Sequence, residues 1–171
     1  MSVSKSAVPL VLKKLGKGSR GEWYLAVQAV LFLLLVAGPF IFRWISAWEF
    51  KGSWFTSLSG SALFFAGIII AATGVISLGK NLTPLPLPRE NSALIVTGAY
   101  RYVRHPIYSG IIFMAFGWAL WRHNWITVGL ALLLSAFFDI KSRFEERLLQ
   151  AKFPAYMEYR KRVRKLLPFI Y

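Results

Sequence analysis

The chain has 171 residues, of which 56% are apolar, and it carries a formal net charge of +14. Soluble domains of this size contain about 45–50% apolar residues, and here those residues form long blocks, which excludes a water-soluble globular domain. The chain contains no cysteine. Disulfides, cysteine-based metal sites and thiol nucleophiles are therefore excluded as well.

Four apolar blocks follow one another along the chain. A hydrocarbon core about 30 Å thick requires roughly 20 apolar residues in a spanning helix, and residues 23–45 and 58–78 satisfy this length. Two shorter blocks, residues 106–120 and 125–140, are separated by four residues, which is typical of a tight helical hairpin. The pattern predicts an all-α integral membrane helical bundle with about four transmembrane helices.

The first two blocks contain residues that matter for packing. Pro39 leaves a backbone carbonyl of the first block without its helical partner, so a neighbouring group must satisfy it. Gly60, Gly67 and Gly74 recur at intervals of seven in the second block. Small residues on one helical stripe allow two membrane helices to approach closely. We interpret this stripe as a packing surface without chemistry of its own.

The basic residues are concentrated in three segments, residues 1–22, 79–105 and 141–165, whereas the two other loops contain only Arg43, Lys51 and Arg122. The positive-inside rule therefore places both termini and the middle loop in the cytoplasm. The basic surplus indicates contact with lipid headgroups and not nucleic-acid binding. We expect a multi-pass protein of a bacterial inner membrane or the endoplasmic reticulum; its oligomeric state is left open.

Beyond the second block the chain changes character. Pro84, Pro86 and Pro88 predict an extended segment within residues 79–105. Residues 141–165 are charged, with apolar residues at helical spacing, and Pro154 divides them into two amphipathic cytoplasmic helices at the membrane interface. The chain thus divides into a basic arm (1–22), a two-span membrane hairpin (23–78) and a half that carries the polar motifs (79–171).

A first polar cluster precedes the third block. Arg104 and His105 stand directly before Pro106, which suits the first turn of a helix. Free backbone N–H groups at such a helix start favour an anion or a polar cofactor. Three tyrosines belong to the same cluster: Tyr100, Tyr102 and Tyr108. The alternative is that these arginine and tyrosine side chains only anchor the end of a span.

A second polar cluster follows the fourth block and contains Lys141, Arg143, Glu145 and Glu146. These residues could form solvated pairs along one helix, but ionisable groups this close to a bilayer are functional candidates. The hairpin makes the two helices neighbours, so both clusters should lie within side-chain reach. Helix periodicity predicts that Glu146 and Arg143 face the third helix, and that Glu145 forms a surface pair with Lys141.

Together these motifs resemble the isoprenylcysteine carboxyl methyltransferase family, which sits in a wider group with the phospholipid N-methyltransferases. The resemblance covers residues 78–171 and rests on the following run of motifs: residues 98–110, Glu145-Glu146, Phe153, Tyr156, Tyr159, Arg162-Val163 and residues 167–170. Ala99 and Pro154 stand where the family usually has proline and glycine. These departures concern the local backbone shape and remove no polar group.

The resemblance implies an S-adenosylmethionine-dependent methyltransferase that receives its cofactor from the cytosol and a lipidic or prenylated acceptor from the bilayer, with carboxyl O-methylation. Carried over by motif, Arg104, His105 and Tyr108 would hold the cofactor, assisted by Tyr100 and Tyr102. The catalytic candidates, which would bind the polar end of the cofactor or orient the acceptor, are Glu146, Glu145 and Arg143, with Lys141. A sulfonium methyl group is already activated. A carboxylate acceptor therefore has to be placed in line with this methyl group and shielded from water, but it needs no general base and no metal.

Three other functions stay open. Membrane sterol reductases that use NADPH resemble this family in their C-terminal half, but usually have more spans and an Arg-Asp-Glu where this chain has Phe144-Glu145-Glu146. A phospholipid or amine N-methyltransferase cannot be separated from a carboxyl methyltransferase by these motifs. A noncatalytic membrane scaffold would leave the two polar clusters unexplained.

Overall fold

The computed structural model describes residues 21–42, 53–88 and 91–167, so the basic arm expected at residues 1–22 lies outside the described part except for its last two residues. The described chain is helical and contains no strand, which confirms the all-α prediction. Its elements are α2 (Glu22–Ile41), α4 (Ser53–Leu78), the 3-10 turns η1 (Gly79–Asn81) and η2 (Gly98–Arg101), α5 (Pro106–Arg122), α6 (Trp125–Lys152) and α7 (Tyr156–Arg162).

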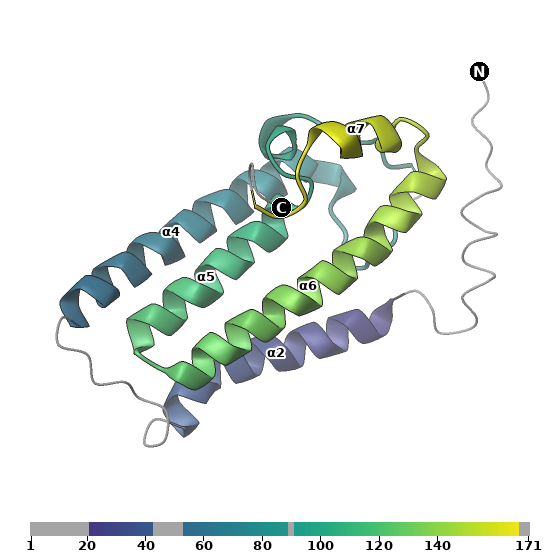
Figure 1. The fold of residues 1–171 in the computed structure, drawn as a ribbon. Helices are drawn as coiled ribbons and strands as arrows, with labels where there is room; N and C mark the ends of the chain where they lie inside the picture. The colour runs from purple at the N-terminus through teal and green to yellow at the C-terminus, as the bar shows by residue number, and fades with distance from the viewer. Residues whose placement is uncertain (1–20, 43–52, 89–90, 168–171) are drawn as a thin grey trace.

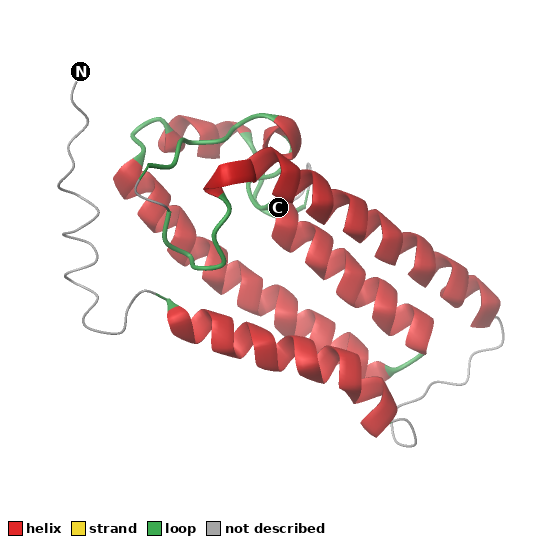
Figure 2. Cartoon of the chain, turned by 180° about the vertical axis from the view of Figure 1, so that it is seen from behind, coloured by secondary structure: helices red, strands yellow, loops and turns green. Residues whose placement is uncertain are grey.

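The four long helices lie side by side in the order α4, α5, α6, α2, as Figure 1 shows. Helix α4 packs on α5, and α2 packs on α6, so the two helices of residues 23–78 supply opposite sides of the bundle. The short helix α7 and the loop that joins α4 to α5 gather at one end of the bundle, which is visible from both directions (Figures 1 and 2). This end carries the polar clusters.

Three segments are long and apolar enough to cross a membrane: Glu22–Ile41, Trp54–Asn81 and Trp125–Lys152. Helix α5 has 17 residues and is therefore about 26 Å long, slightly short of the hydrocarbon thickness. Helix α6 has 28 residues and is about 42 Å long, so its last turns can project beyond the hydrocarbon. Large apolar side chains are exposed along the outer faces, including Leu33, Phe65 and Leu132. The chain is a multi-pass integral membrane protein.

Helices α4 and α5 approach each other through glycine. A Cβ atom at Gly67 would lie 2.5 Å from the carbonyl oxygen of Gly110. One at Gly117 of α5 would lie 2.5 Å from the backbone nitrogen of Phe64. No side chain fits at these distances, so the glycine stripe predicted from the sequence is a backbone-to-backbone contact surface.

The contact between α2 and α6 contains a buried apolar cluster and a polar contact between Gln28 and Lys141. Leu31 and Leu35 of α2 belong to one buried cluster with Leu134 and Phe138 of α6. The carbonyl freed by Pro39 is satisfied as expected, because the indole Nε1 of Trp118 donates to the carbonyl oxygen of Leu35, 3.1 Å away. That carbonyl is the one that Pro39 leaves without a helical partner.

The hairpin between α5 and α6 is closed by capping groups. His123 ends α5 in the left-handed conformation, with φ of 50°. Asn124 caps α6, and its side-chain oxygen accepts from the backbone N–H of Thr127 at 2.9 Å. At the other end, Pro106 occupies the first turn of α5, and Pro154 separates α6 from α7, as predicted. Residues 141–152 continue α6 and do not form a separate helix. The two polar clusters are thereby brought to the same end of neighbouring helices.

Candidate active site

The segment that enters α5 is fixed by the C-terminal tail. The backbone N–H of Arg104 donates to the carbonyl oxygen of Arg164 at 2.8 Å, and that of His105 donates to Lys165 at 3.1 Å. The Ser109 hydroxyl donates to the carbonyl oxygen of Leu166. These two amides are therefore bonded to the tail and are not available to a ligand. Their function is to hold the backbone that aims the Arg104 and His105 side chains.

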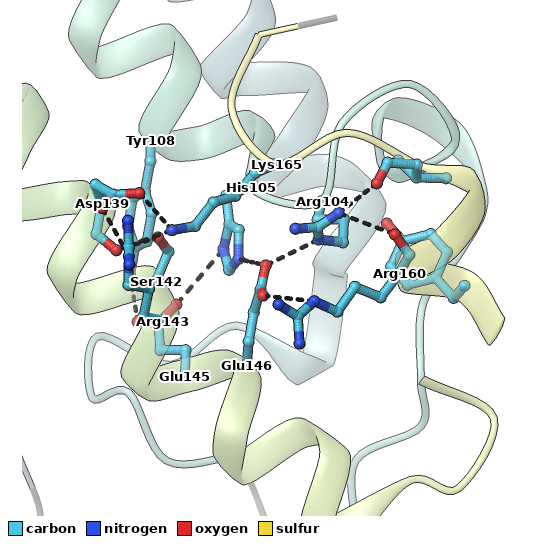
Figure 3. Close-up of polar contacts among 12 residues, drawn as sticks. Arg104, His105, Tyr108, Asp139, Ser142, Arg143, Glu145, Glu146, Arg160 and Lys165 are labelled. Atoms are coloured by element: carbon cyan, nitrogen blue, oxygen red, sulfur yellow. Dashed lines mark hydrogen bonds and ion pairs between the residues drawn. The ribbon is translucent and has the colours of Figure 1, made fainter. Parts of the chain in front are cut away.

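Glu146 is the centre of a buried ionic network (Figure 3). Its Oε1 accepts from Arg104 Nε at 2.8 Å and lies 3.2 Å from His105 Nε2. Its Oε2 lies 3.6 Å from Arg160 Nε on α7. The side chains of Arg104 and Glu146 are only 9% and 5% exposed. The Arg104 guanidinium also donates to the carbonyl oxygens of Arg160 and Val163, so it joins α6, α7 and the tail.

Glu145 lies on the other side of the same imidazole. Its Oε1 accepts from the Tyr108 hydroxyl, and its Oε2 lies 3.6 Å from His105 Nδ1. The side chain is 15% exposed, so the prediction that Glu145 forms a surface pair with Lys141 is wrong. The two adjacent carboxylates flank His105, and the Tyr108 ring stacks on the imidazole with an interplanar angle of 3°.

Two residues predicted for the site point elsewhere. Arg143 is 62% exposed and donates from Nε to Asp139 at 2.8 Å, one turn back on α6. Tyr102 is 64% exposed and does not line the cavity described next. Arg104, His105, Tyr108, Glu145 and Glu146 come together, whereas Arg143 and Tyr102 do not.

A cavity of about 360 Å³ adjoins the network. Its polar side contains Tyr100, Arg104, His105, Tyr108, Lys141 and Glu145. Its apolar side is formed by residues of the α4–α5 loop between Leu82 and Ile95, together with Leu25 of α2 and Ile107 and Ile111 of α5. Sequence reasoning missed the contributions of the loop and of α2. The proline spacing showed that the loop is extended, but not which surface it covers.

The tyrosines of the C-terminal segment complete the cavity wall. The Tyr159 hydroxyl donates to the carbonyl oxygen of Tyr100 at 2.6 Å. The Tyr156 hydroxyl is buried and has no hydrogen-bond partner within the described chain. Burial raises the pKa of Tyr100, Tyr156 and Tyr159 above the usual value of a phenol. All three therefore stay neutral at physiological pH.

A second cavity of about 540 Å³ lies behind Glu146. It is lined mainly by basic side chains: Arg104, Arg143, Arg147, Arg160, Arg164 and Lys165. Burial lowers the pKa of Lys165, whose ammonium pairs with Asp139. Arg104 lines both cavities, whereas Glu146 lines only this basic one and Glu145 lines only the more apolar one.

Fold and site define a class of protein, a multi-pass membrane helical bundle with a buried ionic network at one end and a mixed polar and apolar cavity beside it. The solved structure titled eukaryotic intramembrane Ras methyltransferase ICMT (isoprenylcysteine carboxyl methyltransferase) has the same fold, with a TM-score of 0.64 and 21% sequence identity. The match covers 87% of this chain and 53% of that chain.

Sequence comparison gives the family. Residues 55–155 match the profile described as Phospholipid methyltransferase. The chain is 34% identical over 126 residues to the "Probable protein-S-isoprenylcysteine O-methyltransferase" of Oryza sativa subsp. indica, a match that covers 71% of this chain and 66% of the relative. It is 32% identical over 124 residues to "Protein-S-isoprenylcysteine O-methyltransferase B" of Arabidopsis thaliana, covering 70% and 63%.

The chain therefore belongs to the phospholipid methyltransferase family, in its isoprenylcysteine carboxyl methyltransferase branch. It spans about two thirds of the length of the curated relatives that it matches and about half of the solved structure. The predicted membership is confirmed.

Proposed function

We propose that this chain is a membrane methyltransferase that uses S-adenosylmethionine to methylate the carboxylate of a lipophilic, prenyl-type acceptor. The observation that carries the proposal is the cavity that joins Glu145, His105 and Tyr108 to an apolar wall at the end of a membrane bundle. Such a cavity offers charged groups to a cationic donor and an apolar wall to a lipophilic acceptor. The names of the relatives support the same reaction.

The residues of this cavity fit the proposed cofactor. Its volume of about 360 Å³ lies in the range of small-molecule sites. Glu145 supplies a buried carboxylate that would attract a cationic group, and Tyr156 forms part of the same wall. S-adenosylmethionine would supply a methyl group already activated by a sulfonium. Tyr100, Tyr108 and Arg104 line the same space and would complete the contacts.

The protein's own contribution is positioning and exclusion of water. Glu146 holds Arg104 and His105 in place from outside the cavity, so we assign it as a positioning residue. His105 is fixed between two carboxylates and stacked on Tyr108, which leaves it one orientation. Because methyl transfer to a carboxylate releases no proton, a rigid and dry contact of about 3–3.5 Å between the reacting atoms suffices.

The experiment that tests the proposal is methyl transfer from labelled S-adenosylmethionine to two acceptors, a farnesylcysteine with a free carboxylate and phosphatidylethanolamine. We expect label on the farnesylcysteine, released as methanol by mild base, because methyl esters hydrolyse and N-methyl groups do not. Stable label on the amine lipid would instead support phospholipid N-methylation, which the family description favours. Binding of NADPH without binding of S-adenosylhomocysteine would refute both methyltransferase functions.

We further propose that both termini and the α4–α5 loop face the cytoplasm, as the distribution of basic residues predicts. The chain contains no cysteine, so any thiol labelling of this protein comes from the introduced cysteine. In intact cells, Asn91→Cys should be protected from an impermeant thiol reagent, whereas Arg122→Cys at the opposite end of the bundle should be labelled. The reverse pattern would overturn the orientation.

A further inference from the structure

Lys141 is a buried cation without a carboxylate partner in the described chain. The residue is 2% exposed, and it lines the cavity that we assign to the reaction. Its ammonium donates to Gln28 Oε1 of α2 at 2.8 Å and lies 5.2 Å from the centre of the Tyr108 ring. Within the described ranges no Asp or Glu oxygen lies within 4 Å of it, since Glu145, one turn later, contacts Tyr108 and His105.

The other buried lysine shows how unusual this environment is. Lys165 is also buried, and its ammonium pairs with Asp139 Oδ1 at 2.5 Å and with the Asp139 carbonyl oxygen at 3.0 Å. A buried charge is costly unless it is paired and hydrogen-bonded. A neutral amide and an aromatic face supply only part of what the Lys141 ammonium lost by leaving water. An anion in the cavity would supply the rest.

Gln28 adds a second donor at the same place. Its side-chain oxygen accepts from Lys141, whereas no hydrogen bond is formed by its side-chain nitrogen within the described chain. Gln28 and Lys141 line the cavity together with the apolar side chains of Leu25, Ile107 and Ile111. An anion held here would therefore continue into an apolar region, as the headgroup of a lipophilic acid would.

The charges of the cavity are arranged in a defined order. Glu145 and Lys141 are four residues apart on α6, so they are stacked about one helical turn, roughly 6 Å, along the same face. A cationic donor is favoured beside Glu145, and an anionic acceptor beside Lys141. A neutral or cationic acceptor, such as the amine of a phospholipid, gains nothing from Lys141.

We infer that Lys141 and Gln28 form the subsite that binds the acceptor's carboxylate and thereby select a carboxylic acid over an amine; this inference rests on the proposed function. In the step it serves, a lone pair of the bound carboxylate forms the new O–C bond. The C–S bond breaks with its electron pair moving to sulfur, and no proton is transferred. A cationic donor and an anionic acceptor become two neutral products, which would weaken the hold of both subsites after transfer.

The test separates binding from turnover. The full-length protein in nanodiscs is titrated with labelled N-acetyl-S-farnesylcysteine, in competition with its neutral carboxamide, for the wild type and for Lys141→Met, Lys141→Arg and Gln28→Leu. Lys161→Met is the matched control, because Lys161 is an exposed lysine that pairs with Glu158. Affinity for S-adenosylhomocysteine is measured for every variant, to show that the fold and the cofactor site persist.

We expect the wild type to bind the carboxylate at least about tenfold more tightly than the carboxamide, because a desolvated charge pair is lost with the amide. Lys141→Met should abolish this preference, Lys141→Arg should retain most of it, and Gln28→Leu should reduce it. Cofactor affinity should change in none of them. A Lys141→Met protein that still prefers the carboxylate would overturn the inference.

The two proposals fail in different ways. If the wild type transfers no methyl group but its carboxylate preference depends on Lys141, the subsite is supported and the proposed reaction is refuted. If the wild type methylates the farnesylcysteine carboxylate and Lys141→Met does so with unchanged KM, the proposed reaction is supported and the subsite is refuted.

Discussion

Helix α5 is held by two different kinds of contact. Along α4 it packs backbone against backbone, with Gly67 and Gly110 so close that neither accepts a side chain. At its start it meets α6 through His105 and Tyr108, which contact Glu145 and Glu146. The contact with α4 requires residues without a side chain, whereas the contact with α6 is formed by charged and polar side chains. Shape therefore fixes where α5 lies, while the ionic contact supplies the groups that can meet a ligand.

A substitution in the ionic contact should lower the enzymatic activity more than one in the glycine contact. Glu146→Gln removes the charge that Arg104, His105 and Arg160 share. Leaving a buried partner uncompensated typically costs about 3–5 kcal/mol, so we expect methyl transfer to fall by two to three orders of magnitude or more. The measurement is the initial rate with labelled S-adenosylmethionine. Glu158→Gln is the control, because Glu158 is exposed and pairs only with Lys161 and Arg162; equal losses in both variants would contradict the assignment.

The second largest effect is expected from loss of the His105 imidazole. His105→Ala removes contacts to two carboxylates, and a hydrogen bond to a charged group contributes about 1.5–3 kcal/mol. We therefore expect affinity for S-adenosylhomocysteine to fall by roughly ten- to a hundredfold, measured by calorimetry. His123→Asn, at the opposite end of the bundle, tolerates the same left-handed backbone and should leave this affinity unchanged. Unchanged binding in His105→Ala would remove His105 from the cofactor site.

The glycine contact should show the smallest effect, and in stability. A Cβ at Gly67 would lie 2.5 Å from the Gly110 carbonyl oxygen and 2.7 Å from the Met114 nitrogen. Such overpacking costs about 1–3 kcal/mol, so Gly67→Ala should lower the Tm of the purified protein. The Tm of Gly129→Ala should not fall, because a Cβ there meets no atom within 4 Å and alanine favours the helix. A Gly67→Ala protein as stable as the wild type would show that the helices can separate without cost.

Both kinds of contact were visible in the sequence to different degrees. The glycine spacing predicted close packing, and the hairpin loop predicted that the clusters before α5 and after α6 would meet. The orientation of Glu145 and Arg143 was predicted wrongly, because adjacent residues differ by about 100° around a helix and the rotation of α6 about its axis is set by α2 and α5. Tyr102 was included for its proximity in sequence, although the 3-10 turn η2 precedes it and its side chain is exposed.

The remaining parts of the site had no periodic signal. Gln28 reaches the cavity from α2, more than one hundred residues before Lys141. The tail from Arg164 to Leu166 accepts hydrogen bonds from the start of α5 through main-chain carbonyls. Every residue has such a carbonyl, so the residue types do not reveal this contact. The positions of such groups follow from tertiary packing alone.

The tail contact also orders the events of biosynthesis. The carbonyls of Arg164 and Lys165 fix the backbone of Arg104 and His105, although about sixty residues separate the two segments. During translation, the segment with Arg104 and His105 is synthesised before the carbonyls that fix it. The ionic network can therefore acquire the geometry described here only after residues 164–166 have been synthesised and have docked.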